Sequence, residues 1–435
     1  MKLPNDHPDR LALNDELHAR PPEALIPPLH LSFLALRADW SARERQWRQV
    51  ADLAERFDVE PPEPGASHFS ADLGAFRLKW ERHTEFSRYK FIVAGPEEHP
   101  FDKLAINAVP PDWLEALEGE VMVACHVAYL PAGGPPLNYD EIADHAFAGN
   151  ILVGGGVAGG AATAVTDFRI HADGFSRILV QNRSMTARQA GRTIQRLLEI
   201  DTYRMMALLA LPVARTLGLA LTQSEKELAS ITASLVDAER ENEHQLLERL
   251  SRLEAEIESR YTENLFRFGA SSAYYALVQR RIAELREERT TGLQTIEEFM
   301  ERRLTPAMST FQAVAARQES LSERVARASQ LLATRVEVTR QGQNQALLGS
   351  MNRRAKLQLR LQETVEGLSV AAVTYYVSAL VGHIAEGFEA GGLRVDVRLV
   401  EAVSIPFIAL LTWLGVRRIR RIVAREQQGV DHRGH

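Results

Sequence analysis

Two apolar segments close to the C-terminus constrain this chain more than any other feature. The first covers residues 367–388 and is long enough to cross the roughly 30 Å hydrocarbon core of a bilayer as a helix. The second covers residues 400–416; it is shorter and contains Pro406, but it still lies near the lower length limit for a span. We therefore predict a transmembrane hairpin over residues 367–416.

Basic residues flank this hairpin on both sides, and few lie between its two segments. The loop carries only Arg394 and Arg398, against Glu389 and Asp396. Because basic residues favour the cytoplasmic side, we expect both termini in the cytoplasm and the loop outside. The same residues can also bind anionic lipid headgroups. The flanking residues are Arg353, Arg354, Lys356 and Arg360 before the hairpin, and Arg417, Arg418, Arg420, Arg421 and Arg425 after it.

Composition excludes several classes of protein. A formal net charge of −6 over 435 residues is atypical of a general nucleic-acid binder. The single cysteine, Cys125, lies in an apolar run and rules out an internal disulfide framework. The N-terminal residues MKLPNDHPDR contain no apolar core of a signal peptide, so we expect insertion to depend on the hairpin.

An α+β domain is predicted over residues 29–185, after a polar arm over residues 1–28. Strands mixed with short helices favour a largely antiparallel sheet. Asp173-Gly174 predicts a tight hairpin turn, since this pair tolerates a positive φ. The expected strands are 29–36, 75–81, 84–94, 120–130, 149–156, 163–171 and 175–182, and the expected helices are 40–57, 101–107 and 139–147.

A helical stalk is predicted over residues 186–366. We expect helices over 186–220, interrupted near Pro212, and then over 222–268 and 272–304. The leucine-rich stripe in 222–268 has coiled-coil spacing. Pro306 predicts a break or a helix start. A final helix from 307 to 388 would extend about 120 Å and would need packing partners. These can be helices 222–268 and 272–304, copies from other subunits, or both, and we expect a homo-oligomer.

Several strings in the chain resemble a bacterial family of uncharacterised membrane-anchored proteins, domain of unknown function 3422. They are LNDELHARP (13–21), RLKWERHTEFSRYKF (77–91), NILVGGGVAGGAATAVTDF (150–168), RLLEIDTYRMMALLALPVAR (196–215) and QNQALLGSMNRRAKLQLRLQETVEGLSVAAVTYY (343–376). The resemblance implies a membrane-anchored bacterial protein, which we expect in the inner membrane. The arginines after the second segment predict a basic cytoplasmic tail at 417–435. The resemblance implies no activity and no catalytic residue.

The layout is also similar to that of CorA-type magnesium channels, which place an α/β domain and a long stalk helix before two spans. That family carries a Gly-Met-Asn signature where its first span ends. The corresponding stretch here reads LVGHIAEGFEAGG and lacks the triplet.

Small residues recur along one face of the first apolar segment. Such a stripe lets helices approach closely in lipid, but it can also line a narrow pore. Near the outer end, His383 and Glu386 can form a cation-selective ring in an oligomer, or simply reach the headgroup region. The stripe consists of Gly367, Ala371, Thr374, Ser378, Gly382 and Ala385.

The sequence WERHTEF is the densest polar cluster of the α+β domain. If residues 80–86 form one strand, Glu81, His83 and Glu85 share a face and can bind a divalent cation. The alternative is a solvated or cross-strand-paired row of charges. Glu16, His18 and Arg20 of the arm can complete such a site if the arm folds over the strand.

Residues 154–160, GGGVAGG, contain the pattern G-x-G-x-x-G after an apolar run. A dinucleotide site needs a helix that opens at the end of this pattern, whereas the residues that follow are β-branched. A tightly packed glycine strand is therefore the better interpretation. The chain is expected to need no cofactor.

Taken together, these features predict a non-enzymatic, membrane-anchored scaffold or sensor. The alternative is an oligomeric cation channel or transporter with a CorA-like layout.

Overall fold

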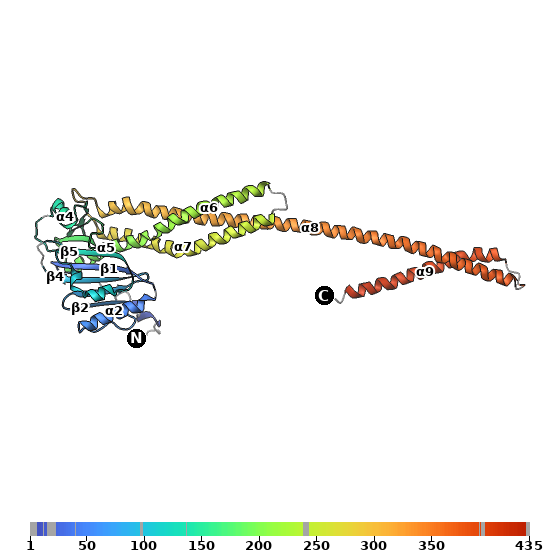
Figure 1. The fold of residues 1–435 in the computed structure, drawn as a ribbon, viewed down its shortest axis with the longest axis horizontal. Helices are drawn as coiled ribbons and strands as arrows, with labels where there is room; N and C mark the ends of the chain where they lie inside the picture. Colours follow the sequence, from blue (N-terminus) through green and yellow to red (C-terminus); the bar gives the residue numbers. More distant parts are fainter. Residues whose placement is uncertain are drawn as a thin grey trace, which may run out of the picture. The chain divides into compact units, whose positions relative to one another are not determined.

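A computed structural model describes residues 7–11, 13–14, 23–39, 41–95, 99–135, 137–237, 243–390, 392 and 396–431, with side chains up to residue 418. Residues 1–330 form one compact unit and residues 331–435 a second. The first unit is a mixed sheet with helices (Figure 1), and the second consists of helices. The chain thus has the predicted α+β architecture followed by long helices.

The sheet has eight strands in the order β2-β3-β4-β1-β5-β8-β7-β6. All neighbouring strands are antiparallel except β5 and β8, which are parallel. The prediction of a largely antiparallel sheet is confirmed. The strands are β1 (Leu29–Arg37), β2 (His68–Asp72), β3 (Arg77–Arg82), β4 (Phe86–Ala94), β5 (Glu120–Leu130), β6 (Val153–Val157), β7 (Ala162–Thr166) and β8 (Ser176–Asn182).

One face of the sheet is covered by short helices. These are α2 (Ala42–Arg56), the 3₁₀ helix η1 (Ala105–Ala108), α3 (Pro111–Glu115) and α4 (Tyr139–Ala146). Val50 and Leu53 of α2 and Trp113 of α3 pack with strand residues such as Trp80 and Phe91 in an apolar core. Alternate side chains of β1, β3 and β4 face this core, and the side chains between them are buried against the opposite face.

The opposite face packs against α5 (Ala187–Leu208) and α7 (Glu243–Leu285). A capping box of Thr186 and Gln189 begins α5. The helix is interrupted only at Leu209, after which α6 (Ala210–Asp237) begins, close to the predicted interruption at Pro212.

After α5, the helices α6, α7 and the first part of α8 (Ile296–Ala390) form a three-helix bundle. Figure 1 shows α6, α7 and α8 side by side. Arg249 of α7 pairs with Glu227 of α6, and Phe268 of α7 packs on Phe311 of α8 with ring centroids 5.5 Å apart. These pairs place α7 antiparallel to both neighbours. The leucine-rich stripe lies in α7, where Leu246, Leu250, Leu253 and Ile257 are buried.

Three predicted helix boundaries were wrong. The helix predicted over 222–268 is divided between α6 and α7, which lie on either side of residues outside the described part of the chain. The helix predicted over 272–304 ends at Leu285, because the connector 286–295 pairs with the β6 strand at Gly156 and Val153. Pro306 does not break α8. The residue four before it, Arg302, is exposed, so water can reach the carbonyl that Pro306 leaves without a donor.

Smaller differences concern the sheet. The helix predicted over 101–107 is reduced to η1, and strand β2 and helix α3 were not predicted. The Asp173-Gly174 turn is present, with Gly174 at φ +84°, although β7 ends at Thr166.

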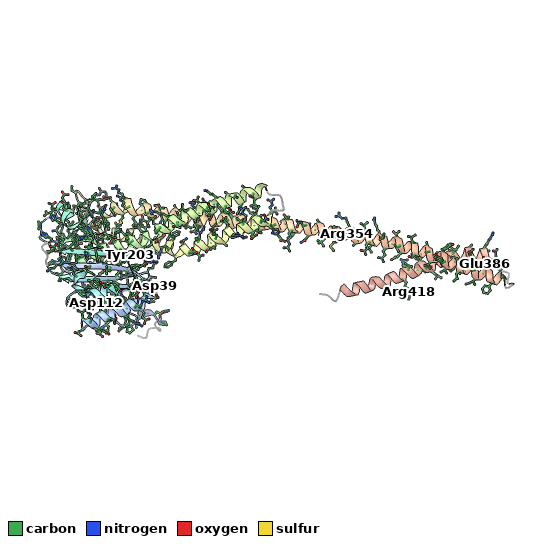
Figure 2. The ribbon with its side chains drawn as sticks, in the orientation of Figure 1. Asp39, Asp112, Tyr203, Arg354, Glu386 and Arg418 are labelled. Carbon is green, nitrogen blue, oxygen red and sulfur yellow. The ribbon has the colours of Figure 1, made fainter. Side chains whose placement is uncertain are left out.

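The second unit contains the rest of α8 and helix α9 (Val397–Asp431). Figure 2 marks Arg354 and Glu386 on α8 and Arg418 on α9. Both helices carry stretches that are long and apolar enough to cross a membrane. The continuous segment of α5 and α6 also meets this criterion, a third candidate that was not predicted.

Candidate functional site

Strands β3 and β4 turn a charged face toward α5 and α7. Along these strands, apolar residues alternate with Lys79, Glu81, Arg88 and Lys90. The pairing places Glu81 opposite Arg88 and Lys79 opposite Lys90. All four residues are buried, at 5% relative exposure or less. Burying an ionic group costs free energy unless a group of opposite charge pairs with it, so the burial of these residues depends on their ion pairs.

Glu81 and Arg88 are at the centre of this buried ionic layer. Arg88 Nη2 donates to Glu81 Oε2 at 2.8 Å, and its Nη1 donates to Glu199 Oε1 of α5 at 3.2 Å. Lys79 Nζ lies 3.2 Å from Glu81 Oε1. Glu199 also accepts a hydrogen bond from Arg281 of α7. The ion pairs therefore run from the sheet through α5 to α7 without interruption.

The ionic layer shifts the pKa values of its members. Burial acts to raise the pKa of Glu81, but the cations Arg88, Lys90 and Lys79 outweigh it and lower this pKa to about 2. Burial lowers the pKa of Lys90 to about 8, although Glu81 opposes the shift. Glu81 is thus an anion at neutral pH, whereas burial disfavours the charged form of Lys90.

An aromatic group borders the ionic layer at the turn between β3 and β4. Phe86 packs against Tyr203 of α5 and Tyr274 of α7, whose rings stack with centroids 5.8 Å apart. Next to it, Glu85 pairs with Arg267 of α7. Burial raises the pKa of Tyr274, and the neighbouring Glu85 carboxylate adds to the shift. The turn between β3 and β4 therefore contacts both α5 and α7.

The predicted row of Glu81, His83 and Glu85 does not exist. Residues 80–86 are not one strand, because β3 ends at Arg82 and β4 begins at Phe86. Glu81 points into the ionic layer, His83 stacks on Phe86, and Glu85 pairs with Arg267. Among the described residues, no group of three or more His, Cys, Asp and Glu is placed to hold a metal ion. Glu16, His18 and Arg20 lie outside the described residues.

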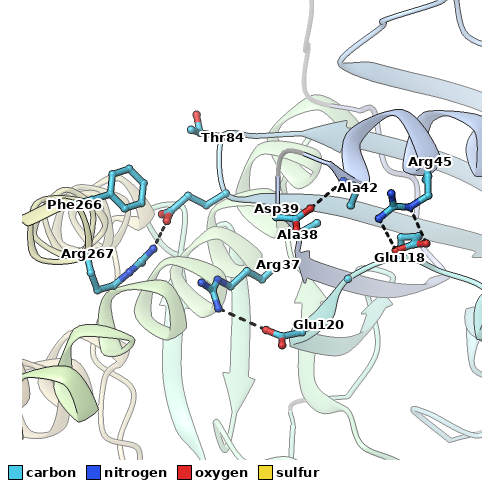
Figure 3. A pocket seen from close by; sticks show the side chains of 12 residues that line it. Arg37, Ala38, Asp39, Ala42, Arg45, Thr84, Glu118, Glu120, Phe266 and Arg267 are labelled. Atoms are coloured by element: carbon cyan, nitrogen blue, oxygen red, sulfur yellow. Dashed lines mark hydrogen bonds and ion pairs between the residues drawn. The ribbon is translucent and has the colours of Figure 1, made fainter. Parts of the chain in front are cut away.

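A cavity of about 650 Å³ opens beside this turn (Figure 3). Charged residues from β1, α2, β5 with its preceding loop, and α7 line it, and each arginine among them pairs with a carboxylate. Arg37 lies 3.6 Å from Glu120, and Arg45 Nε donates to Glu118 at 2.9 Å. Because every arginine that lines the cavity is already paired, the cavity offers no unpaired cation to an anionic ligand.

The glycine strand predicted at 154–160 is confirmed as β6 and the turn that follows it. A Cβ on Gly154 would lie 2.0 Å from the carbonyl oxygen of Ala164, and one on Gly155 would lie 2.5 Å from that of Glu288. The glycines thus let the connector 286–295 approach the sheet edge. The helix N-terminus that a dinucleotide site needs does not follow.

The predicted residues of the first apolar segment lie on α8 and occupy two different environments. Ser378 and Ala385 are buried, and a Cβ on Gly382 would lie 2.9 Å from the carboxylate of Glu401 on α9. This part of the small-residue stripe therefore packs against α9. His383 Nδ1 lies 3.3 Å from Glu386 Oε2, and both side chains are exposed, at 78% and 65%.

The predicted basic residues flank the apolar stretches of α8 and α9. Arg353 and Arg354 are exposed on α8, and Arg417 and Arg418 lie on α9, with Arg417 stacked over Trp413 at 4.8 Å. The side chains of Arg420 and Arg421 lie outside the described part of the structure.

Sequence reasoning missed the ionic layer, although its signal was present. Glu199 and Asp201 interrupt an otherwise apolar stretch of α5, and both are buried. A charged residue in a core-facing stripe implies a buried partner of opposite sign. For Glu199 this partner is Arg88 of β4, whereas Asp201 pairs with Arg204 on α5 itself.

The fold and its buried ionic layer define an α+β protein with long C-terminal helices apolar enough for membrane association. The family model described as "Protein of unknown function (DUF3422)" matches residues 5–423. The chain therefore belongs to this family. It has no significant match among the curated proteins or among the solved structures, so the similarity to CorA-type channels gains no support.

Proposed function

We propose that this protein is a non-enzymatic scaffold or sensor anchored in the bacterial inner membrane. Its α+β domain and helical stalk lie in the cytoplasm, and α8 and α9 form a two-span hairpin with both chain termini inside. The observation that carries the proposal is the exposure of apolar side chains on one helix. On α8, Leu368, Tyr375 and Leu380 are 61–72% exposed. A lipid environment would cover this surface.

The third apolar segment, formed by α5 and α6, is assigned to the cytoplasmic part of the protein. Leu197, Leu198 and Met206 of α5 are buried at 4% or less, and so are Leu217 and Leu221 of α6. Their apolar surface is already covered within the first unit. Two spans rather than three therefore account for the exposed apolar surface, with residues 353–360 and 417–425 on the cytoplasmic side.

The topology can be tested with single cysteines, because Cys125 is buried and the chain has no other cysteine. In a Cys125→Ala background, Gly392→Cys should react with a membrane-impermeant maleimide in intact spheroplasts. Ser350→Cys should react only after the membrane is permeabilised. Reaction of both positions from the same side would refute the two-span topology.

The scaffold is proposed to be a homo-oligomer, since a helix as long as α8 exposes more apolar surface than one chain covers. The mass of the detergent-solubilised protein should exceed that of one chain by an integer factor. A chain truncated after residue 365 provides the comparison, because it retains the first unit. A monomeric full-length protein that turns over a small substrate would contradict the proposal.

A cation channel or transporter is the second candidate, and the exposed His383–Glu386 pair favours it. Ionisable groups on a membrane helix need polar surroundings, which a pore or a subunit contact supplies. In reconstituted liposomes, His383→Ala and Glu386→Ala should then change cation flux. Absence of flux in the wild type would eliminate this candidate.

A further inference from the structure

A groove lined with arginines lies between the start of α5 and the end of α7. Its volume is about 550 Å³, which is within the range of small-molecule sites. Four of its residues are arginines, and Ala158 of the turn after β6 closes one side. The lining residues are Ala158, Gln189, Arg192, Thr193, Arg196, Arg280, Ala283, Glu284 and Arg286.

The groove carries an excess of positive charge. Glu284 is its one lining carboxylate, against Arg192, Arg196, Arg280 and Arg286. This differs from the cavity of Figure 3, whose lining has three arginines against four carboxylates. Arg192 is exposed and makes no ion pair with any described side chain. An anion is therefore the complementary ligand.

Glu284 organises two of the arginines. Its Oε2 accepts a hydrogen bond from Arg196 Nε at 3.3 Å, and its Oε1 accepts one from Arg280 Nε at 3.1 Å. Each guanidinium is held through its Nε. The side chain of Arg196 is only 29% exposed, whereas that of Arg280 is 71% exposed. One arginine is thus fixed in the wall and the other is accessible at the rim.

The helix itself gives no reason for this arrangement. The first turn of α5 contains no acidic residue that could pair with Arg192, which lies in the second turn. Arg192 and Arg196 are also four residues apart, a spacing at which like charges repel. The pair with Glu284 ties α5 to α7 and accounts for Arg196, whereas Arg192 has no such partner among the described side chains.

We propose that this groove binds a small soluble anion that carries two or more phosphate groups. A guanidinium presents paired N–H donors that match phosphate oxygens, and several phosphates can engage arginines of both helices at once. The proposal goes beyond anchoring and scaffolding: it gives the cytoplasmic domain a ligand to sense. Binding at the groove does not require the C-terminal helices to lie in a membrane.

Isothermal titration calorimetry of the full-length protein, in a phosphate-free detergent and buffer, tests the proposal. Pyrophosphate and ATP should bind, orthophosphate should bind more weakly, and added salt should weaken all three. The double variant Arg192→Gln/Arg280→Gln should weaken pyrophosphate binding at least about tenfold, since two charge-assisted contacts are lost.

The double variant Arg215→Gln/Arg252→Gln is the matched control. Arg252 pairs with Glu248 four residues away at 3.2 Å, as Arg280 pairs with Glu284, but it lies outside the groove. The control should bind pyrophosphate like the wild type. If the groove variant does not fold, Arg192→Lys keeps the charge, and its weaker binding would show that the guanidinium fork matters.

Three results would overturn the proposal. They are absence of binding by pyrophosphate and ATP, equal weakening in the groove and control variants, and a response only to vesicles of anionic phospholipid. The last would place the anion site at a lipid surface. None of these results bears on the cysteine-labelling topology, so failure here is distinguishable from failure of the membrane anchor.

Discussion

The two parts of α8 carry similar apolar side chains in opposite environments. Between residues 296 and 325, Leu304, Met308 and Phe311 are at most 3% exposed, because α6 and α7 cover them. Further along the same helix, Leu347, Leu368 and Leu380 are 59–67% exposed. The same helix therefore buries its apolar side chains in one part and exposes them in the other. The first part belongs to a protein core, and the second needs lipid or a partner.

The first unit also contains buried ion pairs, and removing one partner of such a pair should lower the free energy of unfolding. Arg88→Ala should have the largest effect among the substitutions considered, since it leaves Glu81 and Glu199 buried without their shared cation. We expect the free energy of unfolding to fall by about 3–5 kcal/mol. Arg354→Ala, on the exposed part of α8, should change it by less than about 0.5 kcal/mol. Urea unfolding in detergent measures both, and equal effects would remove the distinction between the units.

A pair of leucine truncations makes the comparison within α8 itself. Leu304→Ala should cost about 2–5 kcal/mol in urea unfolding, because it leaves a cavity in the bundle. Leu368→Ala removes an exposed side chain and should leave the unfolding free energy unchanged within about 0.5 kcal/mol. A large effect of Leu368→Ala would mean that residue 368 packs inside the folded chain.

A glycine pair gives a smaller contrast. Gly155→Ala places a Cβ 2.5 Å from the carbonyl oxygen of Glu288 and should destabilise the first unit by about 1–3 kcal/mol. Gly349→Ala meets no atom within 4 Å and should not lower the thermal midpoint. Equal midpoints for the two variants would show that the connector 286–295 does not depend on β6.

The ionic layer also predicts a dependence on acid. The pKa of Glu81 is lowered from 4.5 to about 2, so its ion pairs contribute fully above pH 4.5. That contribution to stability is lost as the pH falls from 4.5 to about 2, because the unfolded chain binds the proton more readily than the folded chain in this range. Urea unfolding at a series of pH values should show less loss for Glu81→Gln than for the wild type. The same slope in both proteins would indicate that other carboxylates govern acid stability.

The features that could be predicted from sequence are those with a local signal. Alternating strands, the Asp173-Gly174 turn and the apolar stretches of α8 and α9 all lie where local patterns place them. Strand β2 was missed because it alternates between exposed and half-buried positions and lacks a buried face.

The candidate site could not be read in the same way, because its partners are far apart in the chain. Arg88 and Glu199 are 111 residues apart, so the row of charges in β3 and β4 resembles a solvated face. The same holds for the connector 286–295, whose ends are set by pairing with β6 rather than by local turn residues. The arginines of the groove come together only when α7 packs on α5.

Membrane attachment through α8 and α9 is the central claim, and extraction of membranes with alkaline carbonate tests it most directly. The full-length protein should stay in the membrane pellet, and the chain truncated after residue 365 should be released into the supernatant. Release of the full-length protein would contradict the account, since the apolar surface of α8 would then need a protein partner.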